Sequence, residues 1–249
     1  MVINSKQNAI IKYAFSLKDK KGVIKNGECL VESEKLVKEL IASKHTVSAV
    51  LCCETYAQKF AYILQAYKGK IYYISAEISK YLADSVTTSG IFAFVKLPNA
   101  PTDIVPNTNF LVLENLQDPT NFGALIRSAR AFGYNTIYMI GGVFPYSYKT
   151  IRSSMGYVFD VEIINTTISK LKALNLPIFV GDMNGEDLSN VTKNTKRFGI
   201  AIGNEGSGAS TQLKQLATRI IKIPMQNNVE SLNASVSGGI LMYNLSLKN

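Results

Sequence analysis

Polar residues that could bind a phosphate group and orient a ribose occur in three separate segments of the chain. In the first, Asn121 stands beside a predicted helix, from which Arg127 and Arg130 project three residues apart and therefore on neighbouring parts of the surface. A planar guanidinium binds phosphate at fixed geometry, and a nearby amide can orient a hydroxyl group. The alternative is that Asn121 only caps the helix, after a turn formed by Asp118 and Pro119.

The second segment, GIAIGNEGSGAS, ends an apolar strand in a glycine-rich loop, which allows the backbone to approach a ligand closely. It lacks the GK[ST] of a P-loop and does not fit G-x-G-x-x-G, so an ATP- or NAD-dependent enzyme is disfavoured. Glu205 lies among the glycines of this loop. It is either a functional carboxylate or a group that only caps a helix end.

The third segment, Ile223 to Leu245, passes from an apolar strand end through a polar loop into a helix that opens near Leu232 and Asn233. Gly238 and Gly239 lie within that helix, where each costs roughly 1 kcal/mol relative to alanine. Such a cost is consistent with close packing against another backbone. We therefore expect this helix to press against a neighbouring chain.

Two successive alternations of strands and helices must position these segments. The first predicts a smaller α/β domain at 1–96, and the second an α/β domain at 109–249. Between them, 97–108 contains three prolines among polar residues and is the predicted linker.

Two basic stretches could contact RNA. The first is a predicted turn at 18–27, for which the alternative is that it is only solvated. The second is a predicted aromatic loop at 144–156, for which the alternative is a subunit contact.

Composition limits the possible functions. The formal net charge of +9 suggests a polyanionic partner, and all the arginines lie after residue 100. No run approaches the about 18 to 20 apolar residues of a membrane helix, and the first residues lack the apolar stretch of a signal peptide, so we expect a soluble, cytoplasmic protein. Three cysteines in strand-like runs predict buried thiols without a metal site. His45 is the only histidine, which disfavours histidine-based nucleophilic catalysis.

The motifs DPTNFGALIRSARAFG, IAIGNEGSGAS and IPMQNNVESLNASVSGG resemble, in this order, the SpoU-type (TrmH-type) RNA 2′-O-ribose methyltransferases of the SPOUT class. The resemblance covers about 109–245. The pieces NSKQNAIIK and GECLVESEKLVKEL are similar to the ribosomal-protein-like substrate-binding domain that often precedes this catalytic domain. Ser33 departs from that pattern, because the family often has glycine after the acidic residue.

The resemblance implies a C-terminal domain with a mainly parallel sheet and a deep trefoil knot, a homodimer, and S-adenosylmethionine bound in a bent form. The residues that match the family's cofactor positions are Gly203, Ile223, Met225 and Leu232. Those that match its catalytic set are Asn121, Arg127, Glu205, Ser231 and Asn233.

The implied reaction is methylation of a ribose 2′-hydroxyl, most readily in ribosomal RNA because of the appended domain. Arg127 is the family's candidate for the reactive centre, and its pKa above about 12 favours positioning of phosphate or ribose over action as a base. A transfer RNA substrate is the alternative within this class. A non-catalytic RNA-binding or ribosome-associated protein is the alternative outside it, and neither DNA nor a membrane is expected as a partner.

Overall fold

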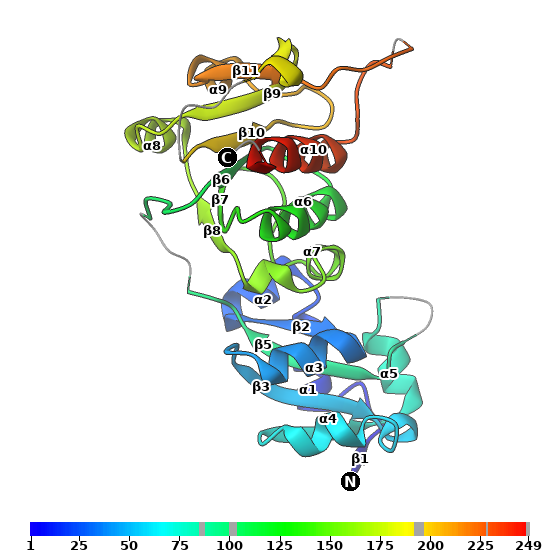
Figure 1. Cartoon of the computed structure of the whole chain (residues 1–249). Helices are drawn as coiled ribbons and strands as arrows, with labels where there is room; N and C mark the ends of the chain where they lie inside the picture. Colours follow the sequence, from blue (N-terminus) through cyan, green and yellow to red (C-terminus); the bar gives the residue numbers. More distant parts are fainter. Residues whose placement is uncertain (85–87, 100–103, 192–196, 228, 248–249) are drawn as a thin grey trace. The chain divides into compact units, whose positions relative to one another are not determined.

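A computed structural model of the chain describes residues 1–84, 88–99, 104–191, 197–227 and 229–247. The chain divides into two compact units, each built on its own sheet (Figure 1). The first unit comprises Met1–Pro98 with Tyr146–Ile151, and the second Asn99–Pro145 with Arg152–Asn249. Of the predicted linker, residues 100–103 lie outside the described residues. No helix in the described ranges is long and apolar enough to cross a membrane.

The first unit is built on a mixed five-stranded sheet of order β1-β4-β3-β5-β2. The strands are β1 (Val2–Ile3), β2 (Glu28–Glu32), β3 (Val47–Cys53), β4 (Lys70–Ile74) and β5 (Ile91–Lys96). The helices are α1 (Ala9–Ser16), α2 (Lys20–Asn26), α3 (Glu34–Ala42), α4 (Ala61–Ala66) and α5 (Ala76–Leu82), with the short 3-10 helix η1 (Glu54–Tyr56). Strand β2 is buried along its whole length and β5 is buried except at Lys96. All three cysteines are buried thiols, as predicted.

The basic stretch at 18–27 is not a turn, which corrects the sequence-based expectation. It contains α2, whose N-cap Asp19 accepts a hydrogen bond from the backbone N–H of Gly22 at 2.8 Å. The helix ends at Gly27, whose φ of +63° is the left-handed conformation that glycine adopts without strain. Only Val23 of this helix is buried, so its sequence carries almost no amphipathic pattern.

The second unit is built on a six-stranded sheet of order β11-β9-β10-β6-β7-β8, in which every described strand pair is parallel. The strands are β6 (Phe110–Glu114), β7 (Thr136–Ile140), β8 (Glu162–Asn165), β9 (Ile178–Asp187), β10 (Gly199–Ile202) and β11 (Arg219–Lys222). The helices are α6 (Pro119–Ala131), α8 (Ile168–Ala173), α9 (Thr211–Gln215) and α10 (Ala234–Leu247), with the 3-10 helices η2 (Tyr157–Phe159) and η3 (Leu188–Asn190). Helix α7 (Tyr148–Ser153) is divided between the units, because its residues up to Ile151 belong to the first unit. The mainly parallel α/β architecture expected for this part of the chain is confirmed.

Strand β9 makes an excursion opposite β11. Ile220 pairs with Val180, but the next residue, Ile221, pairs with Glu186. The residues at 181–185 therefore stand out of the ladder between two paired stretches. A Cβ atom at Gly185 would lie 2.6 Å from the backbone of Ile220, so the excursion closes through a close approach of two backbones.

Two local expectations in this unit are wrong. Helix α6 is capped by Asp118, whose carboxylate accepts from the Thr120 N–H at 2.8 Å, so Asn121 lies inside the helix and is not its N-cap. Pro119 explains the earlier start, since proline suits the first helical position. The stretch at 144–156 is not a loop throughout, because it contains α7.

The glycines of α10 face α6 of the same chain, so they do not supply the expected contact with a neighbouring chain, which stays a prediction for the other faces of the helix. Helix α10 packs beside α6 (Figure 1). A Cβ atom at Gly238 would lie 2.3 Å from Leu125 Cδ2, and one at Gly239 would lie 3.7 Å from Ser128 Oγ. Both Leu125 and Ser128 belong to α6, so the missing side chains allow close packing of two helices within the unit.

Candidate active site

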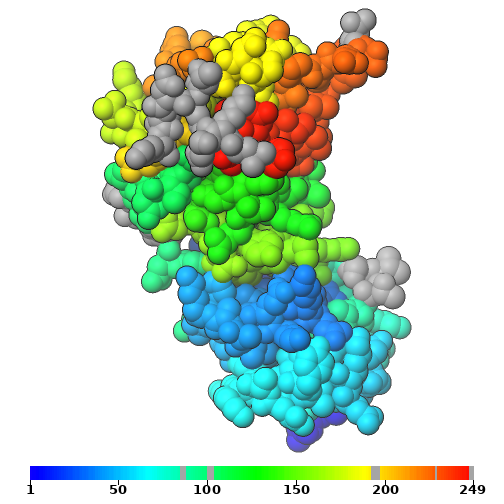
Figure 2. Space-filling view, viewed as in Figure 1, coloured from blue at the N-terminus to red at the C-terminus, as the bar shows by residue number. Residues whose placement is uncertain are grey.

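The loops that follow four parallel strands meet at one edge of the second sheet. Because β6, β9, β10 and β11 are parallel neighbours, their carboxyl ends lie at the same edge, which is where open α/β sheets bind ligands. A cavity of about 1040 Å³ opens there, walled by the excursion of β9, the glycine-rich loop, the segment after β11 and the start of α10. The predicted residues that line it are Gly203, Glu205, Ile223, Met225, Ser231 and Leu232. Figure 2 shows the segment after β11 standing out from the body of this unit.

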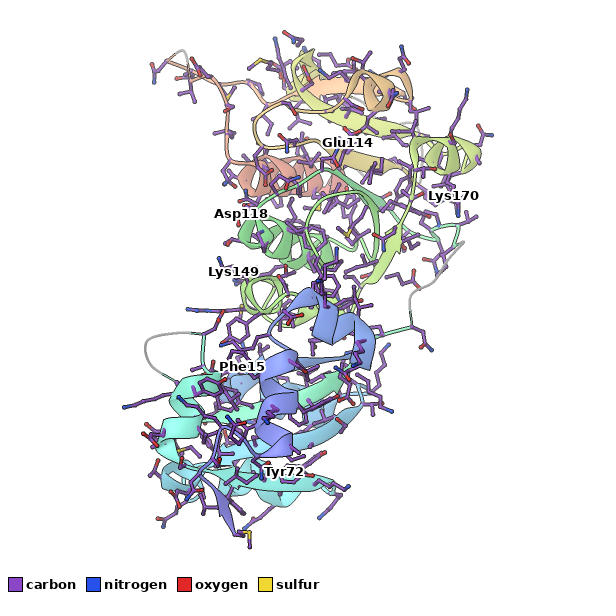
Figure 3. The ribbon with its side chains drawn as sticks, turned by 180° about the vertical axis from the view of Figure 1, so that it is seen from behind. Phe15, Tyr72, Glu114, Asp118, Lys149 and Lys170 are labelled. Atoms are coloured by element: carbon purple, nitrogen blue, oxygen red, sulfur yellow. The ribbon has the colours of Figure 1, made fainter. Side chains whose placement is uncertain are left out.

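Glu205 is held by three donors from the start of α6. Its carboxylate accepts the backbone N–H groups of Gln117 at 3.0 Å and Asp118 at 3.2 Å, and the side-chain amide of Asn121 at 3.2 Å. Figure 3 shows Asp118 at the beginning of this helix. Partial burial acts to raise the pKa of Glu205, but hydrogen bonding from Gln117, Asn121 and Asp118 outweighs it and holds the pKa below its ordinary value. The carboxylate therefore stays ionised near neutral pH.

Asn233 continues this network into the third segment. Its side-chain amide donates to Asn121 Oδ1 at 2.9 Å, while its own Oδ1 accepts from the backbone N–H and the hydroxyl of Ser235 at 2.9 and 2.7 Å. One side chain thus orders the beginning of α10 and connects it to α6. The chain Glu205, Asn121, Asn233 joins the three segments that the sequence singled out.

Arg127 stands apart from this network. Its side chain is exposed, lies outside the cavity lining, and makes no hydrogen bond or ion pair within the described part of the chain. Arg130, by contrast, donates to Asn135 Oδ1 at 2.8 Å. Of the predicted catalytic set, the structure brings Asn121, Glu205 and Asn233 together, whereas Arg127 and Ser231 have no described contact with them.

Gly203 is required by the loop itself. A Cβ atom there would lie 2.2 Å from the backbone of Gly208 and of Ala209, because the loop folds back through the paired hydrogen bonds between Asn204 and Gly208. The side-chain amide of Asn204 also donates to the Asn115 carbonyl at 2.8 Å. The loop that carries Glu205 is therefore fixed against the end of β6.

Two polar groups of this region were not singled out from the sequence. Asp182 and Lys214 both line the cavity and form an ion pair; burial acts to raise the pKa of Asp182, but the Lys214 ammonium and the N–H of Asn184 lower it overall. Glu114, which Figure 3 shows at the end of β6, accepts from the backbone and hydroxyl of Ser210 at 2.8 and 2.7 Å. Their position in the sequence could have identified them, since both carboxylates lie at or just beyond the apolar run of a predicted strand.

The cavity fits a nucleoside of moderate size that carries polar ends. Ile223, Met225 and Leu232 supply apolar surface against which a base can pack, and the glycine-rich loop supplies backbone groups. Glu205 and the ion pair of Asp182 with Lys214 supply charged groups of both signs. A nucleoside with charged ends, such as S-adenosylmethionine, matches this lining.

A parallel α/β sheet with a nucleoside-sized cavity at its carboxyl edge defines a class of nucleotide- or cofactor-binding proteins. Within that class, the chain belongs to the SpoU rRNA methylase family, whose model matches residues 108–243. Residues 8–93 match the MRM3-like substrate binding domain. SpoU proteins are RNA methyltransferases that use S-adenosylmethionine, so the predicted family, enzyme class and cofactor are confirmed.

Relatives match different shares of the chain. The 23S rRNA (guanosine(2553)-2′-O)-methyltransferase RlmP of Bacillus subtilis is 26% identical over 249 residues, covering 98% of both chains. An uncharacterized tRNA/rRNA methyltransferase of Borreliella burgdorferi is 34% identical over 145 residues, which are 56% of this chain and 64% of that relative. A crystal structure of an RNA 2′-O ribose methyltransferase superposes with a TM-score of 0.86 at 26% identity, covering 100% of this chain and 99% of the other.

Proposed function

We propose that the protein transfers the methyl group of S-adenosylmethionine to the 2′-hydroxyl of one ribose in ribosomal RNA. The observation that carries the proposal is the hydrogen-bonded chain of Glu205, Asn121 and Asn233 beside the cavity. The family, the 2′-O-methyltransferase names of two full-length matches and the ribosomal target of RlmP support the same chemistry.

The residues of the site would act mainly by positioning. A ribose hydroxyl is a weak nucleophile near neutral pH, so the site must align it with the methyl group that the bound cofactor supplies. Gly203, Ile223, Met225 and Leu232 hold the cofactor in this proposal. Asn121, Asn233 and Ser231 orient the substrate.

Two charged residues complete the proposed site. The anionic carboxylate of Glu205 keeps the loop after β10 fixed to the start of α6. The exposed Arg127 binds an RNA phosphate or ribose as a permanent cation. Arg127 therefore meets the rest of the site only through the RNA.

The test is radiolabelled methyl transfer onto unmodified total RNA and ribosomal particles, followed by mapping of the modified nucleotide. Label on a ribose of ribosomal RNA supports the proposal. Label on transfer RNA selects the alternative that the Borreliella relative's name also covers. Label on a base contradicts the assigned chemistry, and absence of S-adenosylmethionine binding by folded protein favours a non-catalytic RNA-binding role.

We also propose that the protein acts as a cytoplasmic homodimer whose α10 helices meet. Val236, Ile240 and Tyr243 are 49%, 37% and 54% exposed, and their spacing places them on one face of α10. An apolar stripe on an exposed helix is typical of a subunit contact. Threading of Ile223–Leu245 through a trefoil knot and the domain limits 1–96 and 109–249 remain part of the same proposal.

A further inference from the structure

A pair of stacked aromatic rings joins helices α1 and α5 of the first unit. Phe15 of α1 and Tyr81 of α5 have parallel rings, 9° apart, with centroids separated by 4.7 Å. Tyr81 packs against the buried core, whereas Phe15 is 43% exposed (Figure 3). The half-buried Tyr81 ring thus supports one face of the exposed Phe15 ring.

Two lysines flank this stack. Lys6 Nζ lies 4.6 Å from the centroid of the Tyr81 ring, and Lys18 Nζ lies 5.8 Å from that of Phe15. Lys18 is held in place by the Ala83 carbonyl at 3.0 Å and by Asp84 at 3.5 Å. Lys18 is therefore held at the Phe15 ring by these two contacts.

We propose that Phe15 and Tyr81 form a stacking platform for an unpaired RNA base, with Lys6 and Lys18 beside the adjoining phosphates. This inference rests on the proposed function, because it takes RNA to be the substrate of the protein. Aromatic faces bordered by cations are the usual recognition surface for single-stranded RNA, since every base has a face that can stack and every nucleotide carries a negative charge.

The charges beside the rings favour RNA over a protein partner. The buried centre of a protein–protein interface is depleted in lysine, and here a lysine lies beside each ring. The surplus of lysine over acid in the first hundred residues acts in the same direction.

A second exposed ring in the same unit provides a matched control. Tyr62 is 47% exposed and has Lys38 Nζ at 5.4 Å from its centroid. Its hydroxyl donates to Glu34 at 2.8 Å, and Glu34 also pairs with Lys59 at 3.0 Å. Among the described residues this ring has no stacked aromatic partner, so it lacks the feature on which the proposal rests.

The experiment compares Phe15→Leu and Tyr62→Leu with the unaltered full chain. One probe is a labelled oligouridylate of about 12 nucleotides, a length that single-stranded binding sites commonly span. The other is a ribose-phosphate strand of the same length without bases. Dissociation constants come from fluorescence anisotropy. Thermal unfolding and calorimetry with S-adenosylmethionine check that each variant is folded and retains its cofactor site.

Phe15→Leu should weaken oligouridylate binding by about fivefold or more, the loss expected for one base–aromatic stack, and should leave binding of the strand without bases unchanged. Tyr62→Leu should change neither. Equal binding of oligouridylate by Phe15→Leu and the unaltered chain, equal losses in both variants, or failure of the unaltered chain to prefer the probe with bases would overturn the platform. Absence of methyl transfer with this binding pattern intact would overturn the proposed function alone.

Discussion

Asn233 donates its side-chain amide to Asn121 at 2.9 Å, so the residue that begins the last helix is bonded to a residue inside α6. Neither group is a proton acceptor of useful strength at neutral pH, and their value lies in fixing the two helices and the Glu205 loop relative to one another.

Asn233→Asp should separate the capping role of this residue from its link to Asn121. A carboxylate can still cap α10 through Ser235, but it cannot donate to Asn121. We expect methyl transfer to fall by about tenfold or more, the scale typical of a lost positioning contact, with the melting temperature little changed. Steady-state kinetics and thermal unfolding measure the two effects. Equal activity of the variant and the unaltered chain would show that the link has no role in the reaction.

Glu205→Gln should change how stability depends on acid. The folded-state pKa of Glu205 is depressed, so its contribution is present above the ordinary value of about 4.3 and is lost as pH falls through the folded pKa. The variant should be less stable than the unaltered chain at pH 7, and the difference should shrink below about pH 4. Urea unfolding at stepped pH measures it.

Arg127→Ala should abolish methyl transfer while leaving S-adenosylmethionine binding nearly unchanged, because the guanidinium lies outside the cavity lining and is free to meet RNA. Arg130→Ala is the matched control on the same helix and removes only a bond to Asn135, for which we expect a small change in activity. Transfer assays paired with calorimetry distinguish them. Full activity of Arg127→Ala would remove Arg127 from the proposed site.

Ser33→Gly should stabilise the first unit. Ser33 caps α3 with a φ of +153° and a ψ of +135°, a region that is strained for a residue with a side chain and costs on the order of 1–3 kcal/mol. Loss of the serine cap costs only a few tenths of a kcal/mol when glycine replaces it. The free energy of unfolding in urea should therefore rise by about 1 kcal/mol.

Ser75→Gly is the control for this substitution. Ser75 caps α5 in the same unit but has an ordinary φ of −70°, so glycine relieves no strain there. We expect this variant to be slightly less stable than the unaltered chain. Equal effects of the two substitutions would contradict the assignment of strain to Ser33.

The fold was predictable wherever burial alone determined it, and the site only in part. In β2 and β5 the apolar residues at 29–31 and 91–95 are all buried, and an apolar run in the sequence predicts this burial directly. Helix α2 was missed because one buried residue cannot create a period. The bond from Asn121 to Glu205 joins residues 84 positions apart and depends on which loops the parallel order brings together.

The local conformation of the backbone could not be predicted from the sequence either. The substitution of serine for the family's glycine at position 33 is visible in the sequence, but the positive φ that makes it costly is not. The ion pair of Asp182 with Lys214 likewise depends on the excursion of β9, which the pattern of apolar residues in the sequence does not predict.

Because of that excursion, one wall of the cofactor cavity is formed by the part of β9 where its pairing with β11 is interrupted. The residues at 181–185 lie between Val180, paired with Ile220, and Glu186, paired with Ile221. A ligand in contact with Asp182 therefore bridges two stretches of hydrogen bonds that hold the edge strand β11. Since a ligand stabilises the state that binds it, amide hydrogen exchange along β11 should slow as S-adenosylmethionine is added, and the outermost strand becomes a built-in reporter of occupancy.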